Sequence, residues 1–300
     1  MKKILFIFCL FIGLYGQGQI IQIRVPKKVQ VNNIPAPPFV CGDADANAYI
    51  ANAGITDETY KEALCVFFTG LKDSVALWDS MSTGAAYWLI GGTEDKVKLN
   101  IFNPVNSDAA GRLTFTGSPT FTSSGIDWNG TSQYANTHLA PSDIMGVSSG
   151  HISYYSMEDI ATTSEYPIGS YNGSHNVASY LIIRDNTNKG YFLHPGVTST
   201  YITPTITNSL GFFMGSRTTS SRADYYKNGI SIGNNTGTPG STLSTLPFFI
   251  GALNLNGSPA LYTNKKDGFN SVGRALTTAQ ARALNFLVEQ LMDGMGVGVQ

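Results

Sequence analysis

The sequence predicts a mainly β protein, a sandwich or jelly-roll preceded by a helical segment and closed by a C-terminal helix. From Leu113 onward, short alternating runs of apolar and polar side chains are separated by Gly, Pro and Asn, and no run is long enough for a helix until Leu276. Asn-Gly occurs at 129–130, 172–173, 228–229 and 256–257, and both residues tolerate the positive φ of tight hairpin turns. Charged residues make up only 13% of the chain, about half the share in an average soluble domain, which favours short strands and polar turns.

The charge balance argues against a nucleic-acid partner. The chain has 19 basic and 20 acidic residues, so its net charge is −1 and no global field exists to hold a phosphate backbone. Hydrophobic residues make up 42% of the sequence, which is enough apolar surface for a true core. We therefore expect a globular protein that does not bind nucleic acid.

Residues 1–18 resemble a secretory signal peptide. Lys2 and Lys3 precede an apolar run over 4–14, and the small residues Gly16 and Gly18 follow where a signal peptidase would cleave. We expect cleavage after Gly18. The alternative is an uncleaved hydrophobic anchor, although the run is shorter than the ~18 residues expected of a membrane-spanning helix.

Residues 19–42 predict an extended, proline-rich arm. Apolar and polar residues alternate over 20–31, and Pro35-Ala36-Pro37-Pro38 then fixes φ and removes amide donors. Such an arm can add as a strand to a neighbouring subunit of a homo-oligomer, or it can be a simple linker. After signal removal only Cys41 and Cys65 remain, and they are either a disulfide pair or two small buried side chains.

The segment 43–100 is predicted to be helical and irregular and to pack on the β body. Residues 43–53 and 56–71 have helical periodicity and are separated by Gly54. The jelly-roll follows over 101–293. Its clearest strands are 151–156, 177–183, 210–214 and 248–250, and its strongest hairpin is 224–232.

A single amphipathic helix over 276–293 is predicted to close the chain. Thr277 and Gln280 form a capping-box pattern, and Gly294 is a natural C-terminal stop. One face of this helix carries the apolar residues Leu284, Leu287, Val288 and Leu291.

Three motifs resemble those of laminin-G-like and concanavalin A-like jelly-rolls. Residues 125–135 resemble the strand-turn-strand that opens these domains, and Tyr226-Lys227-Asn228-Gly229 resembles a hairpin of their later half. Residues 249–252 and 269–277 resemble the closing pair of strands, with Gly-Arg-x-Leu-Thr leading into the last helix. Each motif is weak alone, whereas their order and spacing together are fairly specific.

A closer resemblance covers most of the chain after Asp43. It is to laminin-G-like virion proteins of tailed phages and prophages of bacteroidete hosts, and it is carried by residues 71–72, 77–78, 91–93, 103–104, 108–113 and 151–155. The resemblance implies a non-catalytic fibre, collar or capsid-decorating protein on the virion surface. Its implied partners are other virion proteins, further copies of itself, and cell-surface or mucosal glycans used for attachment. The signal-like N-terminus instead favours a secreted bacterial glycan-binding protein, which is the alternative.

No catalytic residues are expected. Retaining glycosidases of this architecture need two carboxylates ~5–5.5 Å apart, usually from alternate positions of one strand, and the sequence contains no such motif. His138, His151, His175 and His194 have no metal-ligand spacing, and His151 is expected to be a partly buried polar residue. No cofactor is expected. Calcium binding is left open, because Asp127, Asp185 and Asp224 are candidate ligands by residue type alone.

Sugar binding would require exposed aromatic rings beside amides or carboxylates, and the chain has 15 tyrosines. Because consecutive strand residues face opposite ways, at least one tyrosine of each Tyr-Tyr pair is expected in the core, and core packing is the commoner role for any single tyrosine. Tyr154, Tyr155 and Tyr180 are possible contacts. The residues chosen as candidate glycan contacts are Trp128, Tyr134, Tyr171, Tyr225 and Tyr226.

Overall fold

The fold is taken from a computed structural model that describes residues 39–107, 110–163, 165–196 and 201–300. The predicted signal peptide and the predicted arm up to Pro38 lie outside these residues. Within the described part, no helix has an apolar stretch long enough to cross a lipid bilayer.

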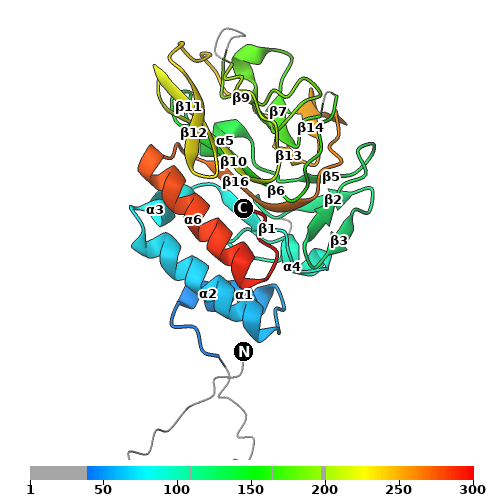
Figure 1. Ribbon diagram of the computed structural model, residues 1–300, viewed down its shortest axis with the longest axis vertical. Coiled ribbons are helices and arrows are strands. Elements are labelled where there is room, and N and C mark those ends of the chain that lie inside the picture. The colour runs from blue at the N-terminus through cyan, green and yellow to red at the C-terminus, as the bar shows by residue number, and fades with distance from the viewer. Residues whose placement is uncertain (1–38, 108–109, 164, 197–200) are drawn as a thin grey trace, which may run out of the picture. The chain divides into compact units, whose positions relative to one another are not determined.

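Two β-sheets pack face to face, which confirms the predicted mainly β, jelly-roll-like sandwich (Figure 1). In the first sheet β1 (Ala85–Trp88) pairs with β16. The other strands of the first sheet, in spatial order, are β12 (Ile230–Asn235), β11 (Arg222–Lys227), β10 (Gly211–Thr219), β6 (Gly150–Ser156), β16 (Asp267–Gly273), β4 (Gly125–Asp127) and β3 (Thr120–Thr122).

The second sheet is built around β7 (Ile168–Tyr171), which pairs with β8 (Ser179–Ile182), and β8 in turn pairs with β9 (Tyr191–Leu193). The β14–β7 pair is parallel, and the other strand pairs of this sheet are antiparallel. Its remaining strands are β15 (Ser258–Ala260), β14 (Leu253–Leu255), β13 (Phe249–Ile250), β5 (Tyr134–Asn136) and β2 (Thr114–Thr116).

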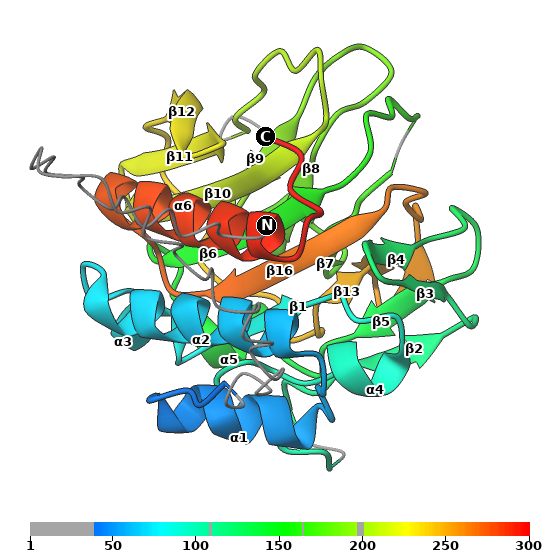
Figure 2. The same cartoon turned by 60° about the horizontal axis from the view of Figure 1, so that its bottom comes forward.

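A helical layer covers the outer face of the first sheet. Figure 2 shows α2 (Glu58–Asp73) and α6 (Thr278–Gly294) running side by side across this face. Phe67 of α2 meets Phe269 of β16 edge to face, with ring centroids 5.9 Å apart. The other helices are α1 (Ala44–Asn52), α3 (Leu77–Met81), α4 (Glu94–Val97), α5 (Pro141–Ile144) and the 3₁₀ turn His175–Val177.

The helices begin where the sequence places their caps. Asp57 accepts a hydrogen bond from the amide of Tyr60 at the start of α2, and Thr277 forms the predicted capping box with Gln280 at the start of α6.

One feature of the segment 43–100 differs from the prediction. Residues 85–88 of the segment expected to be helical and irregular form β1, which extends the first sheet beside β16.

Strand alternation divides the buried side chains between two cores. In β6, Ile152 and Tyr154 lie in the core between the sheets, whereas Tyr155 lies in the core between the first sheet and the helices. Tyr155 is opposite Phe212 and Phe269 of the two neighbouring strands. Because helices cover its outer face, the central strands of this sheet are buried on both sides, and the consecutive tyrosines of β6 and β11 are all core residues.

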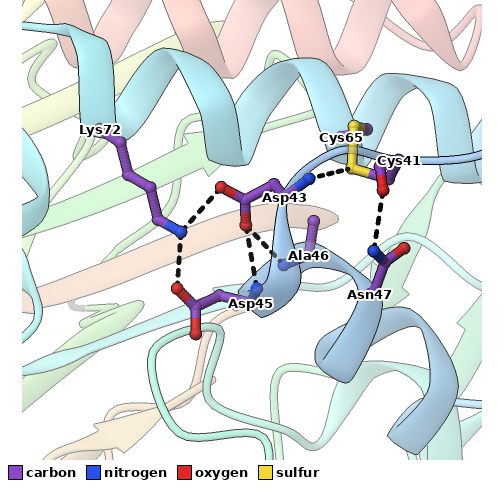
Figure 3. The surroundings of a disulfide bond; sticks show 7 residues. All are labelled: Cys41, Asp43, Asp45, Ala46, Asn47, Cys65 and Lys72. Atoms are coloured by element: carbon purple, nitrogen blue, oxygen red, sulfur yellow. Dashed lines mark hydrogen bonds and ion pairs between the residues drawn. A yellow bond between two sulfur atoms is a disulfide. The ribbon is translucent and has the colours of Figure 1, made fainter.

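A disulfide between Cys41 and Cys65 joins the chain ahead of α1 to the middle of α2 (Figure 3). The Cα atoms are 5.7 Å apart. On the same side of α1, the Asn47 amide donates to the carbonyl oxygen of Cys41 at 2.9 Å. The two cysteines that the sequence left either paired or separately buried are therefore bonded.

Asp43 and Lys72 add an electrostatic link beside the disulfide (Figure 3). Asp43 caps α1 by accepting from the amides of Asp45 and Ala46 at 3.0 and 2.9 Å. The Lys72 ammonium contacts the carboxylates of Asp43 and Asp45 at 2.7 and 2.6 Å. Burial works to raise the pKa of Asp43, but Lys72 and the two amides outweigh it and lower that pKa.

Candidate functional site

Five tyrosines gather on the outer face of the second sheet, the face opposite the sandwich core. In β8 and β9, Leu181 and Phe192 lie in the core between the sheets, so the neighbouring Tyr180 and Tyr191 lie on the other side. We call this group the tyrosine cluster. Its members are Tyr166, Tyr171, Tyr180, Tyr191 and Tyr201.

Two pairs of rings in the cluster pack edge to face. Tyr166 lies 4.9 Å from Tyr180 between ring centroids, and Tyr191 lies 6.4 Å from Tyr201. Tyr180 and Tyr201 share a hydrogen bond between their hydroxyls, and the Tyr201 hydroxyl also bonds to Nδ1 of His175 at 2.7 Å. Burial and this hydroxyl contact raise the pKa of Tyr180, so its hydroxyl keeps its proton.

A pocket of about 290 Å³ opens between four of these rings, and we call it the tyrosine pocket. Tyr180 is buried at its base, while Tyr166, Tyr191 and Tyr201 are partly exposed. The other lining residues are Thr163, Glu165, Ile182, Asp185, Asn186 and Leu261. Aromatic rings thus stand beside two carboxylates, one amide and one hydroxyl in the same hollow.

Asp185 is held in a fixed position in the pocket wall. Its Oδ2 accepts from the Tyr191 hydroxyl at 3.0 Å, and its Oδ1 accepts from the amides of Thr187 and Lys189, both at 2.8 Å. Burial works to raise the pKa of Asp185, but these hydrogen bonds outweigh it and lower that pKa. The carboxylate is therefore ionised at neutral pH and acts as a hydrogen-bond acceptor.

The other carboxylate, Glu165, is tied to a buried lysine. The side chains of Glu165 and Lys265 form an ion pair and are 2% and 0% exposed. The hydroxyl of Thr263 donates to Oε2 of Glu165 at 2.8 Å. These contacts link the chain around Glu165 to the 263–265 segment that precedes β16, and so fix this wall of the pocket.

Three of the five predicted glycan contacts are core residues, so those predictions are wrong. Trp128 is 4% exposed and lies under Gly251, where an added Cβ would stand 2.8 Å from the indole ring. Tyr225 is 0% exposed, and its hydroxyl donates to the carbonyl of Ile182 at 2.9 Å. Tyr226 is 1% exposed and lies under α6. The helical layer explains the last error, because it buries the face of β11 that would otherwise meet solvent.

The other two predicted contacts are on the second sheet. Tyr171 is part of the tyrosine cluster, and its ring meets His175 edge to face at 5.2 Å. Tyr134 is half-buried on β5 and packs against Phe249 at 4.6 Å, and it does not line the tyrosine pocket.

Sequence reasoning also missed three tyrosines of the pocket: Tyr166, Tyr191 and Tyr201. Tyr191 had a usable signal, because Tyr191, Phe192 and Leu193 form a short aromatic and apolar run between Gly190 and Pro195, as a strand would. Tyr166 and Tyr201 come from connecting segments with no strand pattern, so nothing local indicated that they would meet Tyr180.

The histidines and the candidate calcium ligands have structural partners. His151 and His194 are fully buried, so the expectation that His151 is partly buried is wrong. Asp127 pairs with Lys266, and Asp224 pairs with Arg222. Within the described residues, no group of three or more His, Cys, Asp or Glu side chains is placed to hold a metal ion.

Comparisons with known proteins give only distant structural likenesses. No family model matches this sequence, and a search of curated proteins finds no match either. Domain 4 of AbnA, an extracellular arabinanase from Geobacillus stearothermophilus solved with arabinotriose, is 13% identical with a TM-score of 0.44, over 67% of this chain and 96% of that one.

Two larger proteins give similar values. A Trypanosoma rangeli sialidase solved with 2,3-difluorosialic acid is 12% identical with a TM-score of 0.45, over 72% of this chain and 33% of that one. Botulinum neurotoxin type C, whose cell entry depends on two ganglioside molecules, is 12% identical with a TM-score of 0.44, over 68% of this chain and 51% of that one. The chain thus spans about a third of the sialidase and half of the toxin chain.

Proposed function

We propose that this chain is a non-catalytic glycan-binding protein and that the tyrosine pocket is its sugar site. The observation that carries the proposal is the convergence of four tyrosine rings with Asp185 and Asn186 around one hollow. The apolar C–H face of a sugar packs on an aromatic ring, while its hydroxyls need fixed hydrogen-bond partners. Asp185, held by Tyr191 and two backbone amides, offers such an acceptor.

The carboxylates of the pocket support binding rather than hydrolysis. A glycosidase needs a carboxylic acid that stays protonated to donate to the leaving group, which requires a raised pKa. The pKa of Asp185 is lowered by its hydrogen bonds. Glu165 is paired with Lys265 and accepts a hydrogen bond from Thr263, so its oxygens are already bound.

We further propose a place on a virion surface, where the protein would assemble with itself or with other virion proteins and attach the particle to cell-surface or mucosal glycans. This part rests on the motif resemblance to virion proteins of bacteroidete phages. Mass spectrometry of purified particles tests it, and absence of the chain from the particles would overturn it. The alternative, a secreted bacterial glycan-binding protein, predicts a mature N-terminus at Gln19 instead.

Glycan-array binding of the full chain tests the sugar site. We expect Tyr191→Ala to lower the affinity for the bound glycan at least tenfold, equivalent to ~1.4 kcal/mol, because it removes a ring and the hydroxyl that positions Asp185. Tyr134→Ala is the matched control, since Tyr134 is a half-buried tyrosine of the same sheet outside the pocket. The proposal fails if no glycan binds, or if both variants bind as the unaltered protein does.

A further inference from the structure

A second hollow adjoins the tyrosine pocket, and we call it the amide hollow. It has a volume of about 250 Å³ and shares Thr163 and Glu165 with the tyrosine pocket as lining residues. The rest of its lining is polar or small, apart from one tyrosine ring: Asn129, Gly130, Thr162, Tyr262 and Asn264. The two hollows therefore meet at the wall that the Glu165–Lys265 ion pair fixes.

The amide hollow has an unused polar atom. Oγ1 of Thr162 is buried and has no hydrogen-bond partner among the described residues, although a buried hydroxyl ordinarily has one. Thr162 also forms a backbone β-bridge with Asp185, so the threonine that lines one hollow is held beside the aspartate that lines the other. A ligand hydroxyl placed in the amide hollow would give Thr162 its missing partner.

The two hollows together have room for a ligand longer than one sugar. Ligand sites usually have volumes of ~300–1,000 Å³. Each hollow alone, at about 290 and 250 Å³, falls just below that range, whereas both together lie well within it. A ligand that lay across the shared wall would contact tyrosine rings at one end and amide groups at the other.

The charges around the two hollows disfavour an acidic sugar. Among the described residues, no Lys, Arg or His lines either hollow, and the ionisable groups that do line them are the carboxylates of Asp185 and Glu165 and the tyrosine hydroxyls. Lys265 is already paired with Glu165, which leaves Asp185 as the uncompensated charge. The carboxylate of a sialic acid would lose water beside a like charge and gain no cation, and such a contact is strongly unfavourable.

We infer that the two hollows form one continuous site for at least two consecutive residues of an uncharged oligosaccharide. One residue stacks on the tyrosine rings, and the next bonds to Thr162 and Asn264. This inference rests on the proposed function, because it assumes that the tyrosine pocket binds sugar at all.

The test begins with an array of neutral and sialylated glycans of one to six sugar residues, probed with the full chain. Calorimetry then compares the strongest neutral oligosaccharide with the free monosaccharide of its terminal residue. We expect the oligosaccharide to bind at least tenfold more tightly, and we expect its sialylated form to bind more weakly. In Asn264→Ala and Thr162→Val, the gain in affinity from monosaccharide to oligosaccharide should largely disappear. Asn103→Ala, at an exposed asparagine that lines neither hollow, should keep that gain.

The possible failures can be told apart. If no glycan of any kind binds, the proposed function itself is overturned. If glycans bind and Tyr191→Ala weakens them, but Asn264→Ala and Thr162→Val keep the full gain for oligosaccharides, the function stands and the two-hollow inference fails. Stronger binding of sialylated glycans than of their neutral parents would overturn the inference that the ligand is uncharged.

Discussion

Lys265 and Glu165 form an ion pair at a position where neither side chain reaches solvent. Their side chains are 0% and 2% exposed, and the hydroxyl of Thr263 completes the set of partners around Glu165. Two charges removed from water in this way depend on each other, because the loss of either one leaves the other buried without compensation.

We predict that Lys265→Met lowers the free energy of unfolding by about 3–5 kcal/mol, since it leaves the Glu165 carboxylate buried and unpaired. The double variant Lys265→Met/Glu165→Leu should recover a large part of that loss, because no unpaired charge remains. Urea unfolding of both variants measures the effect. A single variant as stable as the unaltered protein would show that the pair makes no such contribution.

The buried histidines predict a loss of stability in acid. A carbonyl oxygen only accepts, so Nδ1 of His151 donates to the Arg274 carbonyl and Nε2 accepts from the Ser271 hydroxyl at 3.0 Å. This arrangement requires the neutral ring. Burial lowers the pKa of His151 to about 4, against about 6.5 in the unfolded chain, so the unfolded state takes up a proton first as the pH falls.

From pH 7 to pH 4.5, His151 alone should therefore reduce the free energy of unfolding by about 2 kcal/mol. His151→Gln has no group that titrates in this range, so the variant should lose about 2 kcal/mol less than the unaltered protein over the same interval. Urea unfolding at the two pH values measures the difference. Equal losses in the two proteins would contradict a neutral, buried His151.

The disulfide predicts a stability that depends on redox conditions. Cys41 and Cys65 are 24 residues apart, and a cross-link closing a loop of this length stabilises a fold by about 3 kcal/mol. We expect Cys41→Ser/Cys65→Ser to lose about that amount. Dithiothreitol should destabilise the unaltered protein similarly and leave the double variant unchanged. Intact mass under non-reducing conditions is the direct check, and two free thiols would contradict the bond.

Core and pocket tyrosines should respond differently to truncation. We predict that Tyr225→Ala costs about 3–5 kcal/mol of unfolding free energy, because it opens a cavity between the sheets and leaves the Ile182 carbonyl without its partner. Tyr191→Ala, at a partly exposed ring, should cost about 1 kcal/mol or less. Thermal unfolding of the two variants compares them directly, and similar losses would contradict the assignment of Tyr225 to the core and Tyr191 to the surface.

Local patterns were enough to predict the fold class and the main helices. The capping box at Thr277 and the apolar spacing from Leu284 to Leu291 belong to one helix, so the sequence carries them in adjacent positions. The hairpin of β11 and β12 was predicted for the same reason, since Asn228-Gly229 forms its turn. Such features depend on neighbours along the chain.

The candidate site could not be predicted in the same way. Trp128 and Tyr226 are residue types that commonly contact sugars. Trp128 is buried beneath Gly251 and Tyr226 beneath α6, and both covering elements are far away in the sequence. Tyr166 and Tyr201 reach the site from connecting segments whose course depends on the strand order of the second sheet. Which aromatic rings stay exposed is decided by the packing of distant elements.

The helical layer and the tyrosine pocket lie on opposite outer faces of the sandwich. Phe39 packs on the helical side, near α1 and α2, whereas β7, β9 and β14 are at the far end of the molecule in Figure 1. Phe39, where the described residues begin, therefore lies on the side of the sandwich away from the tyrosine pocket. If the tyrosine pocket binds sugar as proposed, a partner that contacted the protein through the face around Phe39 would leave the pocket uncovered.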